Sequence, residues 1–169
     1  SGGLVPVPLT IMQILTIDIG TDMVPALGLG AEAAEDSVMQ KPPRSVKERL
    51  LNRNVILVGF LWYGLLGTIF ALGGYFLANF LNGWPNVALA AEGTRTYAQA
   101  TTMMLAGVVF SQMGMVLNNR TDYESVCRRG LFSNRYINAG LVIEVLILLA
   151  ITYIPFLNGI FNTAPITII

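Results

Sequence analysis

The chain has 169 residues, of which 54% are hydrophobic and only 12% are charged, and its mean hydropathy is +0.62. Soluble domains carry about 25% charged residues, so this composition indicates an integral membrane protein. Ten basic and ten acidic side chains cancel, which gives no indication of a nucleic-acid partner. The chain has no histidine and one cysteine, Cys127, which excludes a disulfide within the chain, histidine catalysis and the usual zinc sites.

Four apolar stretches are long enough to cross roughly 30 Å of hydrocarbon, which takes about 20 helical residues. They predict an all-α fold, a polytopic membrane bundle of four transmembrane helices, at about residues 8–31, 55–81, 98–118 and 136–153. The whole of residues 1–169 is expected to be one transmembrane domain. The last apolar patch, which starts at Phe156, is too short and too broken to predict a further span.

Small residues recur at helical spacing in the second stretch, at Gly67, Ala71, Gly74 and Ala78. Pairs of small residues four apart let a neighbouring helix approach closely. This face of the stretch is therefore predicted to pack against another helix.

Basic residues indicate the orientation in the membrane. Of the ten basic residues, five lie in loop 32–54 and four in loop 119–135, and the tenth is Arg95. By the positive-inside rule, these two loops are predicted to be cytoplasmic and both ends extracytoplasmic, in the plasma (inner) membrane. The N-terminus has neither a basic region nor a cleavage signal before its apolar run, so it is not expected to be a natural start.

Two aspartates lie inside the first stretch, where no lysine or arginine is in reach. An unpaired carboxylate near the middle of a bilayer costs roughly 3 kcal/mol. Asp18 and Asp22 share a helical face with Thr21. Because Pro25 has no N–H for the Thr21 carbonyl and Gly20 weakens the helix, the first helix is expected to be unwound near Asp18–Pro25.

Carboxylates, a hydroxyl and a freed carbonyl form the oxygen-rich surroundings that hard cations prefer. The stretch is therefore predicted to bind a cation or conduct a proton. The alternative is that the two aspartates are protonated, or hydrogen-bonded to polar partners, and only fix helix packing.

Two polar residues of later stretches fall at matching depths. At about 1.5 Å per residue, Gln112 lies level with Asp22, and Glu144 lies close to the depth of Asp18. Both are candidate ligands. Glutamine also joins helices by hydrogen bonds, and a lone glutamate can be a protonated packing residue, so these alternatives stay open.

Longer motifs resemble a known family. "IDIGTDMVPALGLGAE", followed by "MQKPPR", resembles the sixth membrane helix and next cytoplasmic loop of P-type cation-transporting ATPases of the calcium and sodium/potassium pump group. "SQMGMVLNNRTDYESVCRRGLFSN" resembles the end of the eighth helix with its loop, and "GLVIEVLILLAITYIPF" resembles the ninth. The resemblance implies a fragment of a ten-helix transport domain, from a pump that hydrolyses ATP through an aspartyl-phosphate.

The resemblance also implies roles for individual residues. Asp22 resembles the sixth-helix aspartate that coordinates ions throughout the group, and Thr21 resembles a neighbouring ligand. Asp18 stands where calcium pumps have asparagine and sodium/potassium pumps have aspartate. Gln112 stands where calcium pumps have glutamate and sodium/potassium pumps have glutamine. Glu144 resembles a ninth-helix glutamate linked to the extra sodium site of sodium/potassium pumps.

Met115 departs from the pattern, because sodium/potassium pumps carry an aspartate ligand there. The family's "DKTG" and "TGE" motifs and its nucleotide domain are expected to precede residue 1. The chain is therefore expected to be a C-terminal fragment that is inactive alone and joins the N-terminal part of the same pump in the lipid bilayer. Its cargo would be Na⁺, K⁺, H⁺ or Ca²⁺, while ATP and Mg²⁺ would bind the missing domains. The sequence leaves open whether an accessory subunit is present.

Two other functions stay open on the residues alone. One is an ion-coupled secondary transporter or channel subunit that uses the same acids without ATP hydrolysis. The other is a structural membrane anchor whose acids are protonated. The resemblance favours the pump.

Overall fold

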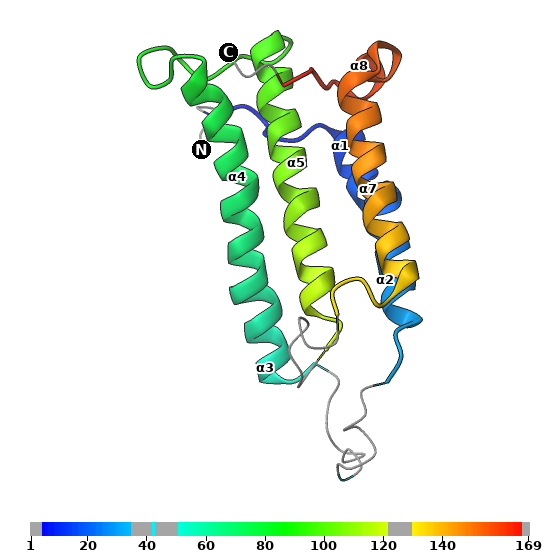
Figure 1. Cartoon of the computed structure of the whole chain (residues 1–169). Helices are drawn as coiled ribbons and strands as arrows, with labels where there is room; N and C mark the ends of the chain where they lie inside the picture. Colours follow the sequence, from blue (N-terminus) through cyan, green and yellow to red (C-terminus); the bar gives the residue numbers. More distant parts are fainter. Residues whose placement is uncertain (1–4, 35–41, 43–50, 122–129, 167–169) are drawn as a thin grey trace.

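The computed structural model describes residues 5–34, 42, 51–121 and 130–166. Every regular element within these residues is helical (Figure 1), which confirms the all-α prediction. Much of loop 32–54 and the middle of loop 119–135, with Cys127, lie outside the described residues. The elements are α1 Ile11–Leu15, the π-helix η1 Thr16–Thr21, α2 Met23–Gly30, α3 Arg53–Ile56, the π-helix η3 Leu57–Tyr63, α4 Gly64–Leu81, α5 Arg95–Asn118, α7 Arg135–Tyr153 and α8 Pro155–Phe161.

Within the described part of the chain, three helical stretches are long and apolar enough to cross a membrane: Leu57–Leu81, Arg95–Asn118 and Arg135–Tyr153. They correspond to three of the four predicted spans. The second of them begins before the predicted residue 98 because Thr94 caps α5, its hydroxyl oxygen accepting from the Tyr97 N–H at 3.1 Å.

The first predicted span differs from the others. It is helical from Ile11 to Gly30 but is not one regular α-helix, because α1 passes into the π-helix η1, and Asp22, which keeps helical backbone angles (φ −74°, ψ −31°), separates η1 from α2. The apolar patch near the end forms the short helix α8, which is separated from α7 by the extended Ile154 and ends at the left-handed Asn162 (φ 52°).

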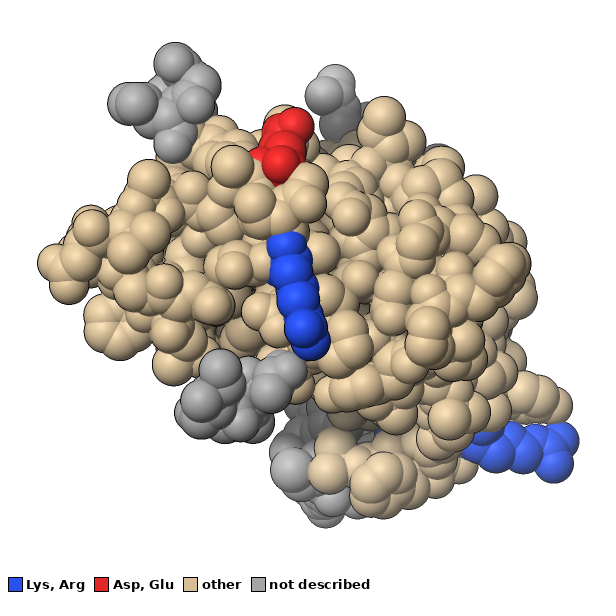
Figure 2. Space-filling view, turned by 90° about the horizontal axis from the view of Figure 1, so that it is seen from above, with Lys and Arg blue, Asp and Glu red and all other residues tan. Residues whose placement is uncertain are grey.

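Both described ends of the chain lie beside the N-terminal end of α5. The Tyr97 hydroxyl donates to the Val7 carbonyl at 2.6 Å, and Gln99 Nε2 donates to the Pro165 carbonyl at 3.0 Å. Figure 1 shows α4, α5 and α7 in a row, with α1 and α2 beside α7. Figure 2, which looks onto this end, shows only a few charged side chains on a surface that is otherwise uncharged.

Helices α4 and α5 pack so closely that backbone meets backbone. A Cβ atom on Gly74 would lie 2.5 Å from the Met103 carbonyl oxygen, and one on Gly107 would lie 2.5 Å from the Phe70 carbonyl oxygen. Ala71 and Ala78 of α4 are buried. The predicted packing role of the small-residue face is therefore confirmed.

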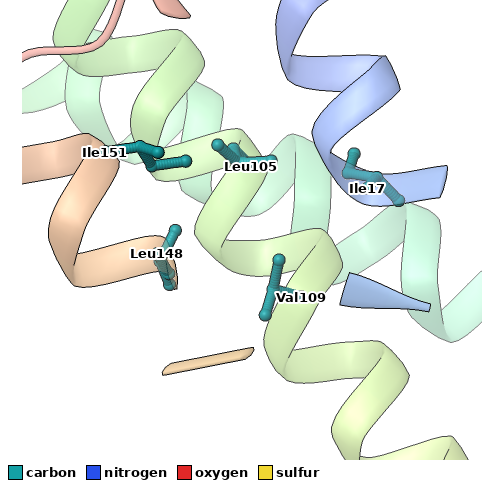
Figure 3. Packing of buried hydrophobic residues seen from close by; sticks show 5 residues of the cluster. All are labelled: Ile17, Leu105, Val109, Leu148 and Ile151. Carbon is teal, nitrogen blue, oxygen red and sulfur yellow. The ribbon is translucent and has the colours of Figure 1, made fainter. Parts of the chain in front are cut away.

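Helix α5 is also the centre of the apolar core. Its Leu105 and Val109 are fully buried, and they lie between Ile17 of η1 on one side and Leu148 and Ile151 of α7 on the other (Figure 3). This cluster holds the first segment and α7 against α5 at the level where the π-helix begins.

Candidate cation site

The first segment changes its backbone geometry where the two aspartates lie. In η1 the Asp22 N–H donates to the carbonyl of Ile17, five residues back, at 3.1 Å. Pro25 has no N–H, and the Ala26 N–H donates to the Asp22 carbonyl at 3.2 Å. The departure from α-helical geometry therefore overlaps the predicted Asp18–Pro25 stretch only in part, and the segment forms a π-helix there instead of unwinding, with Pro25 inside α2. Short π-helices of this kind are rare and often lie at functional sites.

The segment is fixed firmly before this change. Thr10 and Gln13 form a capping box, in which the Thr10 hydroxyl accepts from the Gln13 N–H and the Gln13 side chain accepts from the Thr10 N–H. The Gln13 side chain is fully buried, and its Nε2 donates to Thr101 Oγ1 and to the Asn162 carbonyl, both at 3.2 Å. Helix α1 is thereby joined to α5 and to the segment after α8.

Helix α2 is fixed by α7 instead. A Cβ atom on Gly28 would lie 2.8 Å from Ile137 Cγ1, and one on Gly140 would lie 3.1 Å from the Pro25 nitrogen. These two contacts set an antiparallel register between the helices. Glu144 follows Gly140 by four residues on the same helix face, so it lies one turn beyond the contact with Pro25.

Asp22 and Gln112 are in direct contact. Gln112 Nε2 donates to Asp22 Oδ2 at 3.1 Å. Gln112 follows the buried Val109 by three residues, so both lie on the face of α5 that meets the first segment. The predicted matching depth of these two side chains is therefore confirmed. The other amide atom, Gln112 Oε1, is buried and has no hydrogen-bond partner among the described residues.

Glu144 lies in the buried stripe of α7. Only 1% of it is exposed, and neither carboxyl oxygen has a hydrogen-bond partner within the described part of the chain. A carboxyl group buried in this way is costly unless something satisfies it. Thr21 is also buried (1% exposed), and its hydroxyl donates to the Ile17 carbonyl at 2.9 Å.

The candidate ligands are only partly assembled. Asp18 and Asp22 are exposed, and within the described residues Asp18 makes no hydrogen bond to another candidate, although it lies one turn before Asp22. Across residues 5–34, 42, 51–121 and 130–166, no group of three Asp, Glu, His or Cys side chains is close enough to hold a metal ion. The candidate oxygens thus come from three segments, and among the described residues they do not form a complete cage.

Met115 has a packing role. It lies 3.2 Å from where a Cβ atom on Gly67 would be, and it lines a groove of about 480 Å³ between α4 and α5. The position at which the family resemblance leads one to expect an aspartate is therefore occupied by an apolar contact with α4.

A second polar cluster lies at the opposite end of the bundle from Gln13, and the sequence reasoning missed it. The Arg120 guanidinium binds the Glu32 carboxylate through two bonds, Nε to Oε2 at 3.0 Å and Nη2 to Oε1 at 3.2 Å. The side chain of Arg120 is fully buried, and that of Glu32 is 13% exposed. Arg120 also donates to the carbonyls of Gly130 and Leu131 and to Ser133 Oγ.

Asn134 completes this cluster. Its Nδ2 donates to Glu32 Oε2 at 2.7 Å and to the Gly28 carbonyl at 3.1 Å, while its Oδ1 caps α7 by accepting from the N–H groups of Tyr136 and Ile137. The sequence does contain an indication of the Glu32–Arg120 pair. The two residues have opposite charges, and each directly follows a predicted span, 8–31 or 98–118, that ends at the same predicted side of the membrane.

The fold and these residues define a helical membrane domain with polar oxygens in the middle of its bundle. The sequence profile of the family described as "Cation transporting ATPase, C-terminus" matches residues 6–169. The chain therefore belongs to the P-type cation-transporting ATPases, a family of ATP-driven translocases, and corresponds to their C-terminal membrane domain.

Several pumps are similar to this chain. Potassium-transporting ATPase alpha chain 2 of Rattus norvegicus is 30% identical over 176 residues, which cover 88% of this chain and 17% of that protein. Calcium-transporting ATPase 1 of Saccharomyces cerevisiae is 32% identical over 160 residues, or 94% of this chain and 15% of that protein. Human sodium/potassium-transporting ATPase subunit alpha-3 is 47% identical over 73 residues, which cover 43% of this chain and 7% of that protein. The chain thus spans less than a fifth of these relatives.

Proposed function

We propose that this chain supplies part of the cation site of an ATP-driven pump. The ligands would come from Asp18, Thr21, Asp22, Gln112 and Glu144. The observation that carries the proposal is the contact between Asp22 and Gln112, made where the first segment is broken. Ion sites of transporters are commonly built on such discontinuous helices.

Unsatisfied oxygens support the same proposal. Gln112 Oε1 and both Glu144 oxygens are buried without a hydrogen-bond partner among the described residues. Carboxylate and amide oxygens suit hard cations such as Na⁺, K⁺ and Ca²⁺, while protonation would satisfy Glu144 if H⁺ is transported. Asp18 and Asp22 are exposed, so oxygen atoms from other parts of a complete pump could reach a cation bound to them.

The cargo ion is the finer part of the proposal. The names of the similar pumps include potassium, calcium and sodium/potassium, so these names do not select one ion. Two aspartates with a glutamine, in place of a further carboxylate, favour a monovalent cargo. The packing role of Met115 argues against a full third sodium site.

We further propose that the first segment spans the membrane as a fourth helix, in an integral protein of the plasma (inner) membrane. Loops 32–54 and 119–135 would be cytoplasmic and the ends extracytoplasmic. Nine of the ten basic residues belong to these two loops, and both described ends of the chain meet at the opposite end of the bundle.

The remaining parts of the reaction are assigned to the rest of a complete pump. ATP and Mg²⁺ would bind there, and the chain alone would not hydrolyse ATP. Its partners would be the N-terminal part of the same pump and the lipid bilayer.

The proposal is tested by measuring ATP hydrolysis of the complete protein during separate titrations with Na⁺, K⁺ and Ca²⁺. At least one of these ions, or protons varied through pH, should stimulate turnover in a saturable manner. Hydrolysis that none of them affects would contradict the proposed function.

Asp18→Asn is expected to change ion preference before it stops turnover. The amide keeps an oxygen ligand but removes one charge, so the balance between monovalent and divalent ions should shift by about tenfold, as for other single changes near a metal site. The measurement compares half-maximal concentrations of Na⁺, K⁺ and Ca²⁺ for phosphoenzyme formation in the variant and the unmodified pump. Equal ratios in both proteins would remove Asp18 from the proposed ligands.

A further inference from the structure

We infer that the buried cluster of Glu32, Arg120 and Asn134, called here the inner clamp, positions the cation ligands relative to one another. The inference rests on the proposed function and adds a set of residues that would touch no ion themselves. Its basis is the arrangement of the three segments that the inner clamp joins.

The hydrogen bonds of Arg120 are complete. A guanidinium has five N–H donors, and Arg120 makes five bonds: two to Glu32 and one each to Gly130, Leu131 and Ser133. With no donor left over, Arg120 has no means of binding a further anion. Lysine offers one compact ammonium and cannot reproduce this planar fork, so the geometry specifically requires arginine.

Helices α2, α5 and α7, each of which carries or adjoins a proposed ligand, have one of their two ends at the inner clamp. Glu32 follows α2, which begins directly after Asp22, and Arg120 follows α5, which carries Gln112. Asn134 is the N-cap of α7, which carries Glu144, and it also binds the Gly28 carbonyl in the last turn of α2. A shift of any member of the cluster is therefore transmitted along a rigid helix to a proposed ligand.

The two parts of the first segment are fixed at different places. Helix α1 is fixed near the other end of the bundle through Gln13, whereas α2 is fixed by α7 and by the inner clamp. Asp22 lies between these two fixed parts, since it follows the Ile17 cluster and directly precedes α2. The position of Asp22 relative to Gln112 therefore depends in part on how the inner clamp and α7 hold α2.

The test uses the complete pump with Arg120→Lys and, separately, Glu32→Gln. Glutamine keeps the size of Glu32 but loses its charge and one acceptor. Each variant should raise the cation concentration for half-maximal phosphorylation by ATP about tenfold, as loss of partners behind metal ligands commonly does. Phosphorylation by inorganic phosphate in the absence of cation should persist. Arg135→Lys, at an exposed arginine that begins α7, is the matched control and should leave the half-maximal concentration unchanged.

The titrations use Na⁺, K⁺ and Ca²⁺ separately. A lower melting temperature with an unchanged half-maximal concentration would mean that the inner clamp only stabilises the fold, which overturns the inference. Failure of both variants to yield folded protein would overturn it as well, because the cluster would then be a folding requirement. If Asp22→Ala leaves the cation dependence of phosphorylation unchanged, the proposed function is wrong. If Asp22→Ala abolishes that dependence but the inner-clamp variants leave it unchanged, only this inference is wrong.

Discussion

Asp22→Ala in the complete pump should abolish cation-dependent phosphorylation by ATP. Asp22 lies at the break of the first segment and accepts from Gln112 at 3.1 Å, so its loss removes a proposed ligand and strands the Gln112 amide. If the rest of a complete pump encloses Asp22, which is exposed in this chain, its loss should cost about 3–5 kcal/mol, as for one partner of a buried charged site, or roughly a thousandfold in affinity. The measurement is phosphoenzyme formed from ATP against the concentration of the stimulating ion.

Phosphorylation by inorganic phosphate separates loss of the ion from loss of the fold. Phosphorylation by inorganic phosphate is measured without added cation, so it does not depend on the proposed ligand, and the Asp22→Ala variant should still form phosphoenzyme in this way. Glu92→Ala, which removes an exposed acid just before α5, is the control and should behave like the unmodified pump. Unchanged ion dependence in Asp22→Ala would exclude the proposed cation site.

Alanine at Gly74 or Gly107 should destabilise the membrane domain strongly. At both positions the added methyl group would lie 2.5 Å from a backbone carbonyl oxygen of the facing helix, and a backbone cannot move aside as a flexible side chain can. Overpacking of this kind costs about 1–3 kcal/mol per site. The expected result is a lower midpoint for heat-induced loss of folded pump in detergent.

Two neighbouring glycines provide the matched controls. A Cβ atom on Gly73 or Gly114 would meet nothing within 4 Å, although both residues lie in the same helices, α4 and α5. Alanine is a better helix former than glycine by about 1 kcal/mol, so these two variants should be neutral or slightly stabilised. The same loss of stability at all four positions would contradict the proposed close contact between α4 and α5.

The features predictable from sequence depend on length and local chemistry. Apolar stretches predict spans because a bilayer fixes how long they must be, and three of them are continuous helices. The break of the first segment follows from Pro25, which removes a backbone donor wherever the helix lies. The level of Gln112 with Asp22 follows from the constant rise of helices that cross the same membrane.

The features that the sequence does not predict depend on tertiary contacts. The inner clamp joins Glu32 to Arg120, 88 residues later, and this pairing exists only once α2, α5 and α7 are packed. The π-helix η3 contains no proline and carries no comparable local signal. The contact of Gly140 with Pro25, one turn from Glu144 on α7, is likewise a tertiary contact that no local pattern predicts.

The π-helix η1 also determines which way the first segment faces. Four of the buried residues of this segment, Gln13, Ile17, Thr21 and Pro25, are spaced four apart. In a regular α-helix each step of four residues rotates about 40° beyond a full turn, so three steps would carry Pro25 roughly 120° away from Gln13. A π-helix has a wider turn, which absorbs this rotation and keeps all four residues on one face. A helical wheel drawn at 100° per residue therefore assigns Asp18 and Asp22 to the wrong azimuth relative to Gln13, and only a wheel with an enlarged turn at η1 describes this segment.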